Sequence, residues 1–170
     1  HAHDSVNGGY FDVLDRDWRR EDGAKTNVLE PGSKSQNSHI HILEAFSNLL
    51  RVWPDGQLKL RQRELIELML GRIIDARHHL VLFMKDDWVP VSRECSYGHD
   101  IELSWLLVEA AEVLGDEALL QRCRAVAVDI ASQDWTLVGS GPAVADRSRL
   151  EDARRVLRNH GLSSSPLALV

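Results

Sequence analysis

The amino-acid sequence predicts an all-α fold made of helical hairpins, and three observations predict it. Four stretches carry apolar residues at the three- and four-residue spacing of one helix face. Turn-forming residues divide these stretches into two pairs. A short apolar run with strand character stands between the two pairs. The unit of helix, turn and helix therefore occurs twice, at a spacing of about sixty residues, which is typical of an α/α toroid or an α-solenoid.

The first hairpin is predicted over residues 37–53 and 58–76. Five apolar residues of its first helix recur at helical spacing, namely Ile42, Phe46, Leu49, Leu50 and Trp53. The sequence Pro-Asp-Gly at 54–56 ends this helix and forms the turn. Residues 58–76 repeat the spacing, with strong helix formers between the apolar residues, so they predict the second helix.

The second hairpin is predicted over residues 98–114 and 116–133. Gly115 separates the two helices, and Asp116 is a suitable N-cap for the later one. Ahead of this hairpin, residues 79–84 form a short apolar run that ends in charged residues, which favours a strand. Four or five helices do not close a ring, so we expect part of a toroid.

The two ends of the chain have a different character. Residues 1–36 are rich in Gly, Asp, Asn and Ser, and we expect a loop with a short strand or hairpin that packs onto other elements. We predict a partial α/α-barrel domain over residues 1–135. Residues 136–170 then form a divergent linker and tail, with room for a basic helix. The chain begins without Met, so we expect sequence upstream to be missing.

The composition excludes two classes of partner. The chain has 26 acidic and 20 basic residues and a net charge of −6, spread along the sequence, so it offers no cationic face to nucleic acid. No apolar run approaches the roughly 18 residues of a membrane-spanning helix, and we expect no signal peptide. The two cysteines lack the density of a secreted disulfide scaffold, so we expect a reducing cytoplasm.

Two predicted helices carry polar residues suited to chemistry. At 100° per residue, four polar side chains fall within about 60° of one another, opposite the apolar stripe: Asn37, His41, Glu44 and Asn48. This is either a solvated helix face or a binding face, and its lack of Lys and Arg favours binding. In the third helix, Glu102 follows His99 by three residues and could orient the imidazole. The alternative there is a helix cap with a carboxylate that favours the helix dipole.

Neighbouring histidines also raise the question of a metal site. Residues at i and i+2 point about 160° apart on a helix, so His39 and His41 cannot chelate one ion, and zinc usually binds residues at i and i+4. His99 and Asp100 are similar to a pair in metal-dependent HD-type phosphohydrolases, but no further ligands can be assigned at matching positions. We therefore predict no metal.

Two segments of the chain, read together, resemble the signatures of a known family. They are KSQNSHIHILEAF at residues 34–46 and SYGHDIELSWLL at residues 96–107. Both look like signatures of the N-acylglucosamine 2-epimerase and cellobiose 2-epimerase family. Smaller segments at residues 3–10, 51–54 and 87–88 fall where that family has similar ones, so the resemblance extends over about residues 1–134.

The resemblance implies a partial (α/α)6 toroid and cofactor-free sugar chemistry. In that family twelve helices surround a sugar pocket, and the matched helices supply about a third of them. The ring of a mono- or disaccharide with a free reducing end opens, and a base removes the C2 proton to form an enediolate. Reprotonation on the opposite face gives the epimer, and related members move the proton to C1. Histidine suits these steps because its pKa lies near the working pH.

The resemblance also implies roles for four residues. His99 would be one of the acid/base residues at C2, and Glu102 would bind sugar or orient the imidazole. His41 would assist ring opening or bind sugar oxygens, and Asn37 would hydrogen-bond hydroxyls. The family's second acid/base histidine and its substrate-binding arginine have no match, and His160 does not fit the motif.

The resemblance therefore implies part of a sugar 2-epimerase or aldose–ketose isomerase that is weak or inactive alone. One alternative is a non-catalytic sugar-binding or interaction remnant whose open helical edges associate into a homo-oligomer. Another is an unrelated metal-dependent helical hydrolase. For Trp53 and Trp88 we expect buried structural positions rather than stacking on sugar.

Overall fold

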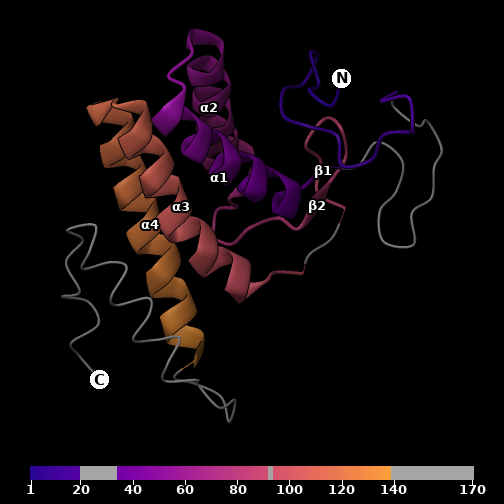
Figure 1. The fold of residues 1–170 in the computed structure, drawn as a ribbon. Coiled ribbons are helices and arrows are strands. Elements are labelled where there is room, and N and C mark those ends of the chain that lie inside the picture. Colours follow the sequence, from indigo (N-terminus) through magenta and orange to yellow (C-terminus); the bar gives the residue numbers. More distant parts are fainter. Residues whose placement is uncertain (20–33, 92–93, 139–170) are drawn as a thin grey trace.

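The computed structural model describes residues 1–19, 34–91 and 94–138, and they form two helical hairpins (Figure 1). The elements in chain order are β1 (Lys34–Ser35), α1 (Gln36–Val52), α2 (Gly56–Leu68), the π-helical turn η1 (Met69–Ile73), β2 (Phe83–Met84), α3 (Tyr97–Leu114) and α4 (Glu117–Val138). The prediction of paired helices with short β segments in the connections is confirmed.

The first hairpin begins and turns at side chains that cap its helices. The Ser35 hydroxyl accepts a hydrogen bond from the backbone N–H of Ser38 and caps α1. The Asp55 carboxylate accepts from two backbone N–H groups at the start of α2. The predicted second helix is not uniform, because α-helical bonding ends at Leu68 and a π turn continues to Ile73. This wider turn leaves Ile73 fully buried.

The second hairpin follows the turn signals of the sequence. Gly115 adopts the left-handed conformation with φ of 76°, and its N–H donates to the carbonyls of the last turn of α3. The Asp116 carboxylate accepts from the backbone N–H of Leu119 and caps α4, as predicted. Helix α4 continues to Val138, past the predicted end near residue 133. Residues 139–170 lie outside the described part of the chain, so the division at residue 135 stays a prediction.

The buried face of α1 differs from the predicted apolar stripe. Trp53, which we expected to be buried, is 58% exposed, whereas Trp88 is buried as expected. The residues of α1 that are buried are Gln36, His39, Ile40, Leu43, Ser47 and Leu50. Because α1 packs against both α2 and α3, its tertiary neighbours decide which side is covered.

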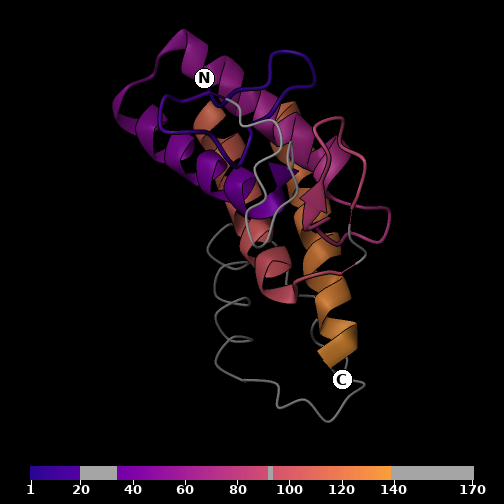
Figure 2. The same ribbon diagram turned by 90° about the vertical axis from the view of Figure 1, so that its right-hand side faces the viewer.

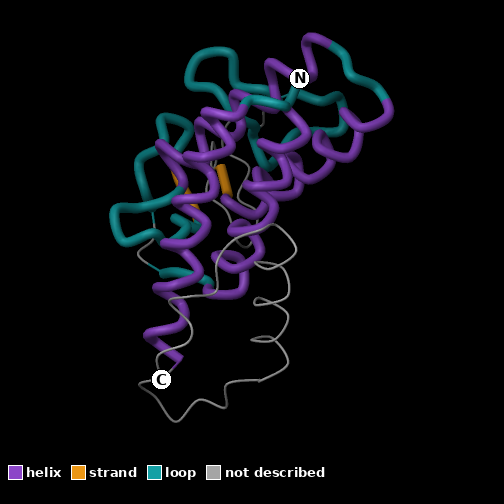
Figure 3. Tube along the Cα trace, turned by 90° about the vertical axis from the view of Figure 1, so that its left-hand side faces the viewer, coloured by secondary structure: helices purple, strands orange, loops and turns teal. Residues whose placement is uncertain are grey.

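Helices α1 and α3 run in the same direction, and both begin at the end of the molecule that carries the small sheet (Figures 1 and 2). Strands β1 and β2 pair antiparallel, with Lys34 opposite Met84 and Ser35 opposite Phe83. The loops gather in the N-terminal segment and in the connection between α2 and α3 (Figure 3). The first turns of α1 and α3 therefore lie on the same side of the fold.

Candidate functional site

The start of α3 holds His99 through a serine. Ser96 is the N-cap residue of α3, and His99 is three residues further on. The Nδ1 atom of the half-buried His99 lies 2.8 Å from the Ser96 hydroxyl oxygen. Within the described residues, Glu102 makes no hydrogen bond to His99, although their spacing suggested one. The group that orients the imidazole in this structure is therefore the Ser96 hydroxyl.

A buried carboxylate fixes the first turn of α3 to the preceding connection. Asp100 is fully buried, and its Oδ2 lies 2.9 Å from Nδ1 of His79. Its Oδ1 accepts a hydrogen bond of 2.8 Å from the backbone N–H of Leu80. Burial raises the pKa of Asp100 above its usual value, against the opposing effect of Leu80 and His79. No local pattern in the sequence predicts this pair, because His79 and Asp100 lie 21 residues apart.

The predicted face of α1 lies open. Asn37 and His41 are exposed, and Nδ1 of His41 lies 3.4 Å from Oε2 of Glu44 on the next turn. In the described ranges no hydrogen bond joins Asn37 or His41 to His99 or Glu102. The four predicted residues thus lie on two neighbouring helices, and a polar contact between α1 and α3 is made instead by Arg51 and Glu109.

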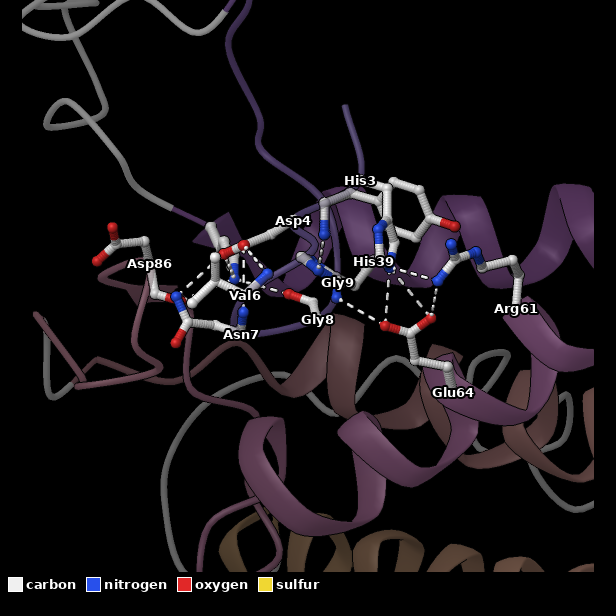
Figure 4. Close-up of polar contacts among 12 residues, drawn as sticks. His3, Asp4, Val6, Asn7, Gly8, Gly9, His39, Arg61, Glu64 and Asp86 are labelled. Carbon is white, nitrogen blue, oxygen red and sulfur yellow. Dashed lines mark hydrogen bonds and ion pairs between the residues drawn. The ribbon is translucent and has the colours of Figure 1, made fainter. Parts of the chain in front are cut away.

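A buried lysine joins the N-terminal segment to the start of α1 (Figure 4). The Lys34 ammonium donates to Oδ2 of Asp4 at 2.8 Å, to the carbonyl of Gly8 at 2.7 Å and to the carbonyl of Asp86 at 2.8 Å. It also lies 4.3 Å from the ring centroid of Trp88. Burial alone would raise the pKa of Asp4, but Lys34 and two backbone N–H groups hold it well below its usual value.

His39 is a structural histidine in the same region. Its Nδ1 atom lies 2.7 Å from the Ser35 carbonyl, and the backbone N–H of Tyr10 donates to its Nε2 at 3.0 Å. Because Nδ1 must donate and Nε2 must accept, the ring is neutral and its tautomer is fixed. Burial lowers the pKa of His39, against the opposing effect of the Ser35 carbonyl. His39 therefore binds the N-terminal segment rather than substrate.

A second polar cluster binds the N-terminal segment to α2 (Figure 4). The His3 ring lies 2.9 Å from the Glu64 carboxylate, which also accepts from Arg61 at 2.8 Å. The backbone N–H of Gly9 donates to the same carboxylate. Sequence reasoning predicted that residues 1–36 pack onto other elements but missed these partners, because they lie 55 to 61 residues apart in the chain.

Among residues 1–19, 34–91 and 94–138, no three His, Cys, Asp or Glu side chains gather as a metal ion would require. None of the helices in these same ranges combines the length and apolar character needed to cross a bilayer.

The fold defines the class of protein, and solved structures supply the comparison. The cellobiose 2-epimerase of Bacillus thermoamylovorans B4167 superimposes with a TM-score of 0.67 and 33% identity, over 78% of this chain and 34% of that one. The enzyme of the same name from Spirochaeta thermophila DSM 6192 gives a TM-score of 0.67 and 28% identity, over 94% of this chain and 35% of that one. The chain is thus part of an α/α toroid of the kind these epimerases form.

Sequence comparison identifies the family. Residues 2–155 match the N-acylglucosamine 2-epimerase (GlcNAc 2-epimerase) family, and the chain belongs to it. A cellobiose 2-epimerase of Bacteroides fragilis is 40% identical over 134 residues, which are 78% of this chain and 34% of that protein. One from Dictyoglomus turgidum is 32% identical over 131 residues, covering 74% and 33%. The chain spans about a third of the length of the curated relatives it matches.

Proposed function

We propose that this chain is part of a sugar 2-epimerase or aldose–ketose isomerase that forms an enediolate at C2 of a reducing-end sugar. The substrate class is a mono- or disaccharide with a free reducing end, and no cofactor takes part. The observation that carries the proposal is the half-buried His99 imidazole, whose Nδ1 is held at the start of α3 while Nε2 makes no hydrogen bond within the described residues. Relatives named cellobiose 2-epimerase support the sugar class.

Each predicted residue has a role in this reaction. His99 removes the C2 proton or returns it, and Glu102 binds the sugar beside it. His41 assists ring opening, and Asn37 binds hydroxyl groups from the open face of α1. Helices α1 and α3 begin on the same side, so the partial positive charge of both N-termini favours the negative charge of an enediolate there.

We expect weak activity, or none, from the chain alone. Inversion at C2 needs a base on each face of the enediolate, and His99 supplies one face. A second copy of the chain could supply groups for the other face, and exposed apolar side chains at the α1–α2 corner favour such a homo-oligomer. Val52 is 81% exposed, Trp53 58% and Leu60 59%. The same observation favours the second candidate, a sugar-binding remnant that self-associates without catalysis.

A cytoplasmic location belongs to the same proposal. Cys95 and Cys123 are both free thiols in the structure, as a reducing compartment would keep them. The net charge of −6 makes nucleic acid an unsuitable partner for the chain.

The test is exchange of the C2 proton in D2O, followed by NMR with glucose, mannose, N-acetylmannosamine and cellobiose. Exchange that is present in the wild type and abolished in His99→Ala supports the proposal. His78→Asn is the matched control, because His78 has a φ of 61°, which Asn tolerates, and lies in the connection rather than on α3. No exchange with any sugar would leave the remnant as the better function, and light scattering of a dilute monomer would exclude the homo-oligomer.

A further inference from the structure

We propose that Ser96 is a positioning residue that holds the orientation of His99 and favours the tautomer with its proton on Nδ1, so that Nε2 is the nitrogen that meets the substrate. The catalytic meaning of this inference rests on the proposed function, whereas the state of the ring can be measured without it.

The contrast between two N-cap serines is the first observation. Ser35 and Ser96 both precede a histidine-bearing helix, and both have extended backbones. The Ser35 hydroxyl accepts a hydrogen bond of 3.2 Å from the backbone N–H of Ser38, which is the usual capping bond. The Ser96 hydroxyl makes no capping bond and instead lies 2.8 Å from Nδ1 of His99. At the N-cap position of α3, the Ser96 hydroxyl therefore binds the His99 imidazole instead of a backbone N–H of the helix.

The start of α3 is held by other groups, so the Ser96 hydroxyl is not needed there. The buried Asp100 carboxylate binds the Leu80 N–H and the His79 ring from within the first turn. The Tyr97 ring packs edge-on against His79, with centroids 5.7 Å apart. These contacts fix the backbone that carries both Ser96 and His99, and they hold the distance between hydroxyl and imidazole.

The chemistry of proton transfer explains why a hydroxyl suits this position. A histidine that takes a proton on Nε2 and gives it back must keep the proton on Nδ1 throughout. A hydroxyl oxygen accepts from Nδ1–H in both the neutral ring and the imidazolium. A carboxylate partner would favour the imidazolium and hinder return of the proton, whereas a hydroxyl adds no charge. His41 has such a carboxylate, Glu44, beside its Nδ1 atom, whereas the Nδ1 atom of His99 contacts a neutral hydroxyl.

The test is the nitrogen-15 NMR spectrum of the His99 ring near pH 8, recorded with long-range proton correlation on the full chain. The wild type is expected to carry its proton on Nδ1, with Nε2 at the shift of an unprotonated nitrogen. In Ser96→Ala the ring is expected to move to the mixture of tautomers found for free histidine. Ser96→Thr keeps the hydroxyl and should keep the wild-type spectrum. Ser35→Ala, which loses the capping bond from the Ser38 N–H and the contact with the Ser38 hydroxyl, should do the same.

Two results would overturn the inference, and a second readout separates it from the proposed function. A wild-type proton on Nε2 contradicts it without any substitution, and so does a Ser96→Ala spectrum equal to the wild type. If the chain exchanges C2 protons, Ser96→Ala is expected to slow that exchange roughly tenfold, the loss of about one hydrogen bond. Absence of exchange from the wild type would count against the sugar chemistry, and the ring spectrum would still decide the role of Ser96.

Discussion

Replacing Gly9 by alanine should release the N-terminal segment from the helices. Gly9 has a φ of +73°, in the left-handed region that glycine adopts freely and alanine does not. A Cβ atom there would lie 2.6 Å from Nε2 of His39 and 2.6 Å from the Trp88 ring. Both distances are shorter than any real contact of a Cβ atom, so something must move.

The magnitude follows from how firmly these two rings are held. His39 is bound at both nitrogens, at 2.7 Å and 3.0 Å, and the Trp88 Nε1–H donates to the Asn7 carbonyl at 2.8 Å. The left-handed backbone costs about 1 kcal/mol for a residue with a Cβ. Overpacking against rigid neighbours costs a further 1 to 3 kcal/mol or so. We therefore expect the free energy of unfolding to fall by about 2 to 4 kcal/mol.

Urea unfolding followed by tryptophan fluorescence measures this loss, since Trp88 lies beside the substituted position. Gly56→Ala is the matched control, because no atom lies within 4 Å of the Cβ it adds and its φ is not positive. That variant should stay within about 0.5 kcal/mol of the wild type. If Gly9→Ala unfolds at the wild-type urea midpoint, Gly9 does not pack closely against His39 and Trp88, and the reasoning is wrong.

Two further predictions concern buried charge. Lys34→Met leaves Asp4 buried without its cation, so the free energy of unfolding should fall by about 3 to 5 kcal/mol, and the double variant with Asp4→Asn should recover part of this loss in urea unfolding. Burial lowers the pKa of His39, so below the ordinary value of about 6.5 the unfolded chain binds a proton that the folded chain does not. Stability contributed by His39 is thus present above that pH and is lost as pH falls, by up to about 1.4 kcal/mol per unit. Unfolding midpoints at pH 7.5 and 5.5 should differ more for the wild type than for His39→Gln, and equal differences would contradict this.

The sequence predicted the junction between α3 and α4 well because local groups decide it. Gly115 and Asp116 end one helix and begin the next through their own backbone conformation and side chain, and both signals can be read without tertiary structure. The exposure of Trp53 could not be read in this way. Apolar spacing shows that a helix has a face to bury, but the neighbours α2 and α3 determine which side of α1 is covered.

The polar partners of the predicted site residues could not be read from the sequence. His99 and Glu102 stand out because a family signature contains them, but their spacing pointed to each other rather than to Ser96. Ser96 and Glu102 each lie three residues from His99, so sequence distance does not favour either as the partner of its Nδ1 atom. The side-chain rotamers decide between them. The partners of Asp100 lie 20 and 21 residues earlier, where no local pattern links them to α3.

The two histidine-bearing helices are fixed in similar ways by different residues. Lys34, two residues before α1, is a buried cation whose ammonium donates to backbone carbonyls of two loops. Asp100, in the first turn of α3, is a buried carboxyl group that accepts a backbone N–H from the connection. In both cases a buried ionisable side chain at the helix start exchanges its hydrogen bonds to water for hydrogen bonds to backbone groups of a loop. Burying such a group costs free energy unless the loop is held in the position that makes these bonds. The proton transfer proposed for His99 requires such a rigid helix start, because an imidazole displaced by an ångström loses much of its rate advantage.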